Sequence, residues 1–462
     1  MRRTSGVFGW ICWSIGCVTL SLSVRAADLD ETVLKLLEAD DAATRAEPTS
    51  PVPKARAPAA SVHEVAPDAN ALSLAEAERL AQDNDAMFKA LREKAGALVE
   101  QSAAANRLAD PKLKFGISEY PTRSADNGPD PIKMVLGVQQ AMSPPLRREH
   151  ESAQLQLMGQ GQTARAVQQK LLALRETRKA WLDIYLQHHT KVILRQTRKI
   201  LAQLVEISQN QYRAGSGNQS DVLQAQIELS LLKDKELQVE TLRETAAAEL
   251  TRWTGPSVAN RSLAMDALDL PAVADLTRIE QGLDRLPLLQ VMKLDADAAK
   301  EGVEVARARA TPEWMWEFET MWSYSQAGGF GSDAVAALIT VDVPFARKNL
   351  QDRWLAGSEK DYNSALFLLA DQRRDLKRML DRETINTRRI EERITFYRDV
   401  ILPQAAQNAQ AALRAYQAQV ADFSQLMRAR QKELESKLEA LRLVVERAQA
   451  QVNLLYLSGD GV

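Results

Sequence analysis

The longest stretch without proline limits what this chain can fold into more than any other feature. No proline occurs between Arg147 and Ala214, and glycine interrupts the stretch only at Gly159 and Gly161. A single α-helix over the whole stretch would extend for roughly 100 Å. Because helices of globular proteins average about 11–12 residues, this segment does not fit an ordinary compact core.

A second stretch of the same kind precedes the C-terminal region. It runs from Ala346 to Leu402, is interrupted only by Gly357, and is followed by Pro403, where we expect a kink. In the last expected helix, apolar residues step by four and three, as in a coiled coil: Leu434, Leu438, Leu441, Val445, Ala448, Val452 and Leu455. By periodicity alone, the simple interpretation of these segments as a helical bundle or coiled-coil tether is as good as a more specific one.

The chain consists of one unit that occurs twice. The same spacing separates Tyr212 from Gly255 and Tyr416 from Gly459, and several residues between them match. Each half is expected to contain a helix, two strands, a very long helix, a tight turn and a long helix. We therefore expect a first repeat at 72–255, a connection at 256–275 and a second repeat at 276–459.

The N-terminal segment is predicted to serve export. Two arginines precede an apolar run, and Ala26 ends a motif of the kind that signal peptidases read, so 1–26 is interpreted as a signal peptide. Both cysteines, Cys12 and Cys17, lie inside it, and acylation of Cys17 is the alternative. Residues 27–71 are expected to form a disordered or linker arm, because much of this segment is rich in Pro, Ala and Ser.

Charge and hydropathy argue against several functions. The chain has 59 Lys and Arg against 61 Asp and Glu, so its net charge of −2 does not favour a nucleic-acid partner. Mean hydropathy is −0.30, and no apolar run long enough for a spanning helix follows the N-terminal segment, which argues against a helical inner-membrane transporter. No catalytic triad, phosphate loop or acid–base pair of convincing placement occurs, so we predict a protein that is not an enzyme and uses no cofactor.

Two hairpins with alternating apolar and polar residues are predicted, one in each repeat. The expected strands lie at about 112–119, 132–142, 313–324 and 334–343. One face of the third strand carries a set of aromatic residues that we interpret as a lipid-facing girdle: Trp314, Trp316, Trp322 and Tyr324. A soluble sheet would instead bury that face in its own core. Four strands cannot close a barrel, and open edges are not tolerated in hydrocarbon, so we expect three copies to share twelve strands.

Metal chemistry has little support in the sequence. His188 and His189 are adjacent on a helix, so their side chains point about 100° apart and cannot chelate one ion together. Met315 and Met321 share the polar face of the third strand with three glutamates, which packing and hydration explain. We therefore predict no metal site. Lys112 and Lys114 face the same side of the sheet and oppose a simple cation-selective field.

Short motifs stand at the ends of the long helices. They are Gln211-Tyr212-Arg213-Ala214-Gly215, then Ser220-Asp221-Val222-Leu223-Gln224-Ala225, and later the run from Tyr397 to Ala405. With the duplication and the placement of the strands, these motifs resemble the outer-membrane efflux channels of the TolC family. The run that contains Pro403 looks most like the heavy-metal branch of that family, the Czc or Cus type.

The resemblance implies a mainly α-helical fold with a small β part. In that family, a homotrimer joins a long α-helical coiled-coil barrel to a shared twelve-stranded β-barrel, to which each subunit contributes four transmembrane strands. The chain would lie in the outer membrane of a Gram-negative bacterium and extend into the periplasm. Its implied partners are copies of itself, outer-membrane lipid, a periplasmic membrane-fusion adaptor and an inner-membrane RND-type pump.

The implied function is passive exit of heavy-metal cations or small toxic compounds that the pump delivers. Two alternatives remain open. One is the outlet of a type I protein secretion system, and the other is a periplasmic coiled-coil scaffold that has no transport function.

The resemblance also places a periplasmic gate and adaptor contacts at the two helix-turn-helix tips. In the first tip, Gly215 and Gly217 fit a tight reversal, because glycine accepts positive φ. Ser220 and Asp221 are expected to cap the next helix. By resemblance, both would also bond to the second hairpin and hold the gate shut, whereas the simpler interpretation of Asp221 is a helix cap alone.

The second tip departs from the family pattern. Tyr416 matches a gate tyrosine, although a packed interfacial aromatic is an equally good interpretation. Gln419 replaces a turn glycine, and Gln425 and Arg428 stand where the family has paired carboxylates. We expect Asp422 to replace those carboxylates in part, and closure to involve Arg428 with Asp221 of the other hairpin.

Overall fold

The computed structural model describes residues 71–120, 132–258, 261–264, 270–325 and 329–459. The predicted signal peptide at 1–26 and nearly all of the predicted arm at 27–71 lie outside the described residues. None of the described helices contains an apolar stretch long enough to cross a membrane.

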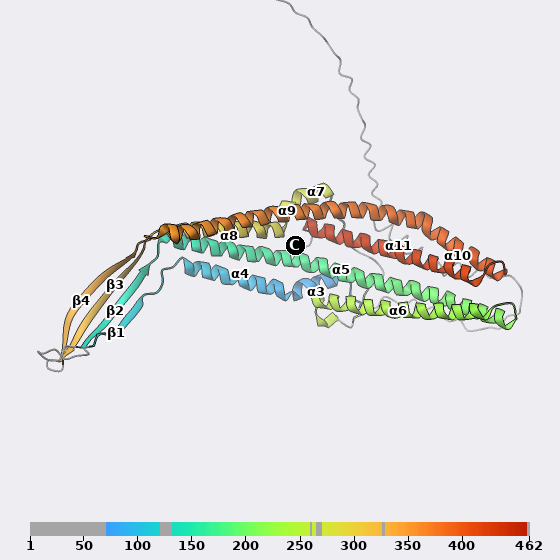
Figure 1. Ribbon diagram of the computed structural model, residues 1–462, viewed down its shortest axis with the longest axis horizontal. Coiled ribbons are helices and arrows are strands. Elements are labelled where there is room, and N and C mark those ends of the chain that lie inside the picture. Colours follow the sequence, from blue (N-terminus) through green and yellow to red (C-terminus); the bar gives the residue numbers. More distant parts are fainter. Residues whose placement is uncertain (1–70, 121–131, 259–260, 265–269, 326–328, 460–462) are drawn as a thin grey trace, which may run out of the picture. The chain divides into compact units, whose positions relative to one another are not determined.

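The same order of elements occurs twice along the chain (Figure 1). The first half contains α3 (Leu74–Asn84), α4 (Ala86–Ala105), β1 (Lys112–Glu119), β2 (Ile132–Met142), α5 (Pro145–Arg213) and α6 (Gln219–Thr254). The second half contains α7 (Leu276–Gly282), α8 (Pro287–Ala308), β3 (Glu313–Ser325), β4 (Gly329–Asp342), α9 (Gln351–Phe396), η4 (Tyr397–Ile401), α10 (Leu402–Gln417) and α11 (Phe423–Ser458).

The last helix of each half ends at a glycine with positive φ. Gly255 ends α6 and Gly459 ends α11, and both have positive φ, of 90° and 75°. Glycine is the residue that ends helices in this way without a steric cost. This agreement supports our proposal of two repeats at 72–255 and 276–459.

The helix α5 is the element against which much of the chain packs. It spans 69 residues and contacts α3, α4, α6, α8 and α11, while α9 packs on α8 and α11 (Figure 1). Its central turns bury Trp181, Leu182, Ile184 and Tyr185 almost completely. The apolar residues of α5 therefore pack against several neighbouring helices in succession rather than into one compact core.

A continuous helical segment passes through Pro403, where the sequence predicted a kink. The turn η4 has π-helical geometry, and the backbone N–H of Leu402 donates to the carbonyl of Tyr397, five residues earlier. A π-turn inserts one extra residue into the helix and so shifts the hydrogen-bond register locally. Pro403 lies at the start of α10, directly after this turn, where its missing N–H is tolerated.

The four strands form one antiparallel sheet in the order β1-β2-β3-β4. The central pair joins the two halves, since β2 pairs with β3 from Ile132 opposite Tyr324 to Met142 opposite Trp314. The last strand, β4, begins at Gly329, before the expected start at 334. The strands β1 and β4 form the two edges of the sheet.

Candidate functional site

One face of the sheet is apolar across all four strands. The register aligns Phe115 with Leu136, and it places Phe318 between Val138 and Ala337. The exposed large apolar residues of this face are Leu113, Phe115, Ile117, Leu136, Met142, Trp314, Trp316, Phe318, Tyr324, Val335 and Ile339. Phe115 is 83% exposed, Ile339 71% and Trp314 54%.

The four residues predicted as a girdle all lie on this face of β3. Trp314, Trp316 and Tyr324 are exposed, and Trp322 is half-buried. Within the described residues, the extensive contacts of the sheet are those between its own strands, so no helix covers the aromatic side chains.

Such a face is costly in water. Burying one large apolar side chain contributes about 1.5–3 kcal/mol, so these partly exposed side chains together represent of order 10–20 kcal/mol of unrealised stabilisation. A whole domain is typically stable by only about 5–15 kcal/mol. A contiguous apolar face of this size indicates a surface that lipid or another protein covers.

The opposite face of the sheet is polar and carries ion pairs. Lys114 of β1 pairs with Glu317 and Glu319 of β3, and Gln139 of β2 also donates to Glu317. At the end of the sheet, Glu313 pairs with an arginine at the start of α5. The two faces therefore differ in chemistry, and the row of Val135 and Met321 is an apolar interruption of the polar face.

The first helical tip reverses the chain between α5 and α6. Gly215 has a φ of 73°, and the amides of Ser216 and Gly217 both donate to the carbonyl of Gln211. The prediction that Ser220 and Asp221 cap α6 is wrong, because the N-cap is Asn218. Ser220 and Asp221 follow it by two and three residues, in the first turn of α6, where a carboxylate interacts favourably with the helix dipole.

The second tip repeats the first, hydrogen bond for hydrogen bond. The amides of Val420 and Ala421 both donate to the carbonyl of Ala415, as those of the first tip do to Gln211. The residue in the place of the glycine is Gln419, with a φ of 58°. Asp422 is the N-cap of α11, and its Oδ1 accepts the backbone N–H of Gln425 at 2.9 Å.

The two tips touch through a small set of side chains. Within the second tip, Tyr416 is buried against Phe423, with 5.5 Å between ring centroids. Burial, together with the nearby negative charge of Asp221, raises the pKa of Tyr416 above its ordinary value. Ser424 of α11 lies 3.3 Å from the side-chain oxygen of Gln224 on α6 and donates to it.

The structure thus brings some of the predicted tip residues together and leaves others apart. The charge of Asp221 is close enough to raise the pKa of Tyr416, and Ser220 Oγ lies 3.5 Å from Asp221 Oδ1. Asp422 and Arg428 are exposed. Within this single chain, the described residues show no ion pair between Asp221 and Arg428, so that contact stays a prediction for neighbouring subunits.

Sequence comparisons find no match for the chain, whereas comparisons with solved structures find several. No family model and no curated protein matches it. A membrane protein from Pseudomonas aeruginosa matches with a TM-score of 0.72 and 16% identity, over 85% of this chain and 94% of that one. The outer membrane protein VceC from Vibrio cholerae gives 0.70 and 15%, over 84% and 96%. The CmeC outer membrane channel of Campylobacter jejuni gives 0.71 and 12%, over 90% and 94%.

The chain has the fold of these outer-membrane proteins. The match covers nearly all of each neighbour and more than four fifths of this chain. The predicted fold class of the subunit, mainly α-helical with a small four-stranded sheet, is confirmed.

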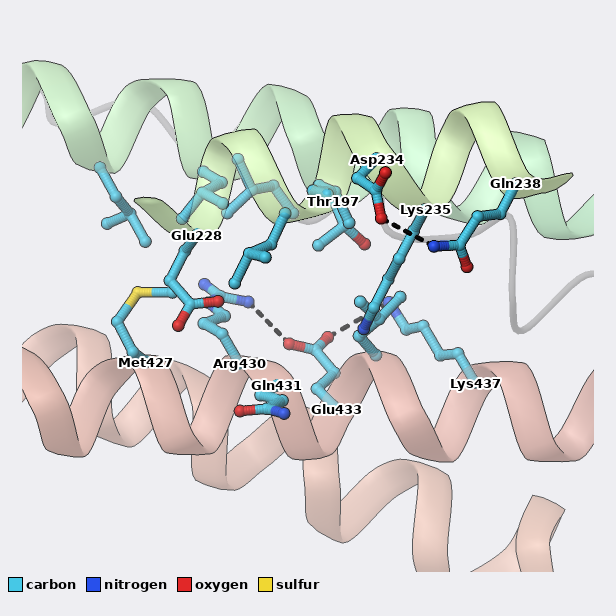
Figure 2. A pocket seen from close by; sticks show the side chains of 16 residues that line it. Thr197, Glu228, Asp234, Lys235, Gln238, Met427, Arg430, Gln431, Glu433 and Lys437 are labelled. Carbon is cyan, nitrogen blue, oxygen red and sulfur yellow. Dashed lines mark hydrogen bonds and ion pairs between the residues drawn. The ribbon is translucent and has the colours of Figure 1, made fainter. Parts of the chain in front are cut away.

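A cavity of about 280 Å³ lies between α5, α6 and α11, close to the tips (Figure 2). Leucines from α5 and α6 line one side, and Glu433 of α11 lies buried on the other. Arg430 and Lys437 pair with Glu433 at 2.8 Å and 3.2 Å. Both partners belong to α11 itself, so the charge of Glu433 is neutralised without a bond across to α6.

Several of these features were missed at the sequence level. The sequence showed that Gln419 replaces a turn glycine, but its left-handed backbone conformation, with a φ of 58°, was not inferred from this. The contact between Ser424 and Gln224 carries no such signal, because it joins different repeats. Among the described residues, no group of three or more His, Cys, Asp or Glu is arranged to hold a metal ion.

Proposed function

We propose that this chain is the outer-membrane channel component of a tripartite efflux system. It acts as a passive exit duct and catalyses no reaction. The observation that carries the proposal is the exposed apolar face of a sheet with two unpaired edges, since lipid covers such a face and copies of the chain pair such edges. Three copies complete a barrel of twelve strands.

The proposed partners follow from the two ends of the molecule. The sheet inserts in the outer membrane, and the tips at Gly215, Gly217, Asp422 and Arg428 lie in the periplasm. There they receive a membrane-fusion adaptor, which links the channel to an inner-membrane RND-type pump. The pump selects the substrate, for which we propose heavy-metal cations or small toxic compounds.

The proposed gate consists of the contacts between the tips. Tyr416 is buried next to Asp221, and Ser220 lies beside that carboxylate. We expect that the double substitution Asp221→Ala with Tyr416→Phe loosens this contact and raises single-channel conductance in planar bilayers. Conductance equal to that of the unmodified protein would contradict a gate at this position.

The lipid contact can be tested with two neighbouring residues of β4. Ile339 is on the apolar face, and Thr340 is on the polar face. A lysine on the lipid side of a barrel costs about 2–4 kcal/mol at the bilayer midplane and far less on the lumen side. Ile339→Lys should therefore lower the yield of heat-modifiable, membrane-inserted protein, and Thr340→Lys should not.

A soluble scaffold predicts the opposite result, because Ile339→Lys would then improve behaviour in water. Purified protein that stays dispersed without detergent would also refute the channel. Deletion of the gene, followed by growth on zinc, cobalt, cadmium, copper and a drug panel, identifies the substrate class. Loss of protein secretion without any new sensitivity would favour the type I outlet instead.

A further inference from the structure

A three-residue charge cluster on the polar face of the sheet spans a whole strand. The Nζ atom of Lys114 in β1 donates to Glu317 Oε1 and to Glu319 Oε2, each at 2.9 Å. Both glutamates belong to β3, and β2 lies between them and β1. Lys114 therefore reaches across its neighbouring strand to the strand beyond.

Gly137 of β2 makes this reach possible. The register aligns Lys114 with Gly137 and Gly137 with Glu319. A Cβ atom at Gly137 would lie 2.9 Å from the Cβ of Glu319 and 3.1 Å from the carbonyl oxygen of Phe318, which is closer than packed atoms approach. The position is thus kept without a side chain, and the lysine crosses the strand at this point.

Exposure shows which group faces the open side of the cluster. The side chains of Glu317 and Glu319 are 12% and 13% exposed, whereas that of Lys114 is 51% exposed. Gln139 also donates to Glu317, at 3.3 Å. The ammonium group therefore caps two carboxylates that are covered on their other sides.

Two carboxylates side by side are a ligand set that divalent cations such as Ca²⁺ prefer. Here the lysine occupies the place that such a cation would take. We propose that Lys114 is a tethered counter-ion that keeps the barrel lumen from retaining divalent cations in transit. The inference rests on the proposed function, because the polar face lines a lumen only when the sheet closes into a barrel.

The test is block of single-channel current by Ca²⁺ added to the barrel side of a planar bilayer. Block from this side is independent of the helical tips at the other end. In Lys114→Gln, the half-blocking concentration should fall about tenfold or more, because the carboxylates lose their internal partner. In Lys114→Arg, which keeps the charge, it should stay at the wild-type value.

Two further variants serve as controls. Lys112→Gln removes a positive charge from the same face of the same strand but leaves the cluster intact, so block should not change. Adding Glu317→Gln and Glu319→Gln to Lys114→Gln should restore weak block. If Lys114→Gln does not assemble, Glu319→Gln in the presence of Lys114 gives the second measurement, since it should shift the reversal potential in a KCl gradient towards anions.

The outcomes separate the two proposals. If Ca²⁺ blocks the Lys114→Gln and Lys112→Gln channels at the same concentration, the counter-ion role of Lys114 is wrong. The proposed channel function would still stand. An unchanged reversal potential in Glu319→Gln overturns it as well. Wild-type protein that forms no channels overturns the proposed function, and this inference with it.

Discussion

Replacing Gln419 by glycine should stabilise the second helical tip. Gln419 has a φ of 58°, the left-handed region in which the Cβ atom of an L-residue is crowded. A non-glycine residue there costs about 1–2 kcal/mol. Glycine removes that cost but adds about 0.5–1 kcal/mol of chain entropy, so the net gain is about 0.5–1 kcal/mol.

The side chain of Gln419 offers nothing that would offset this gain. It is exposed, and no hydrogen bond from it is found among the described residues. The first tip supplies the matched reverse experiment, because Gly215 has the same hydrogen-bond pattern and a φ of 73°. A Cβ atom at Gly215 meets nothing within 4 Å, so Gly215→Gln measures the backbone cost alone.

Hydrogen exchange of individual amides is the appropriate assay, because it reports local opening of the tip rather than unfolding of the whole protein. The amides of Val420 and Ala421, which donate to Ala415, should exchange about two- to fivefold more slowly in Gln419→Gly. Those of Ser216 and Gly217 should exchange faster in Gly215→Gln. Unchanged or faster exchange in Gln419→Gly would refute the assignment of strain to this residue.

Two further predictions concern the long hairpin and the sheet. Arg243 and Lys191 lower the pKa of Glu240 to about 2, so its contribution to stability is present above pH 4.5 and is lost as the pH falls towards 2. Glu240→Gln should remove this acid-sensitive step from amide exchange in α5 and α6. Gly137→Ala should lower the yield of assembled protein on unheated gels, because its Cβ would meet β3, whereas Gly116→Ala should not, since nothing lies within 4 Å there. Equal yields from the two glycine variants would show that the close approach at β2 is relaxed easily.

The parts of the fold that were predictable depend on local rules. The absence of proline between Arg147 and Ala214 was enough to predict α5, which ends at Arg213. Alternation of apolar and polar residues predicted which side chains of β3 share a face, because the period of a strand is fixed at two. The equal spacing of matching residues in the two halves predicted the position of both tips to within a few residues.

Other features depend on contacts that no local rule contains. The N-cap of α6, Asn218, lies two and three residues before the expected caps Ser220 and Asp221, because the backbone turn after Gly215 ends earlier than the polar residues suggest. The effect of Pro403 depended on whether the preceding turn widened, and η4 shows that it did. Asp221 and Tyr416 belong to different repeats. They come close to each other only when the two helical hairpins pack together in the folded chain.

The duplication also explains how a sheet with open edges can close. Each repeat contributes one antiparallel hairpin, and pairing of β2 with β3 continues the alternation of strand direction across the repeat boundary. With an even number of strands, β1 and β4 run in opposite directions. The β4 edge of one copy can therefore pair with the β1 edge of the next in the same antiparallel pattern. This head-to-tail contact uses two different surfaces, and contacts of that kind build closed rings when the rotation between copies is suitable. The same pairing carries Lys114 of each copy to an equivalent place around the ring, so its proposed role as counter-ion is multiplied by the number of subunits.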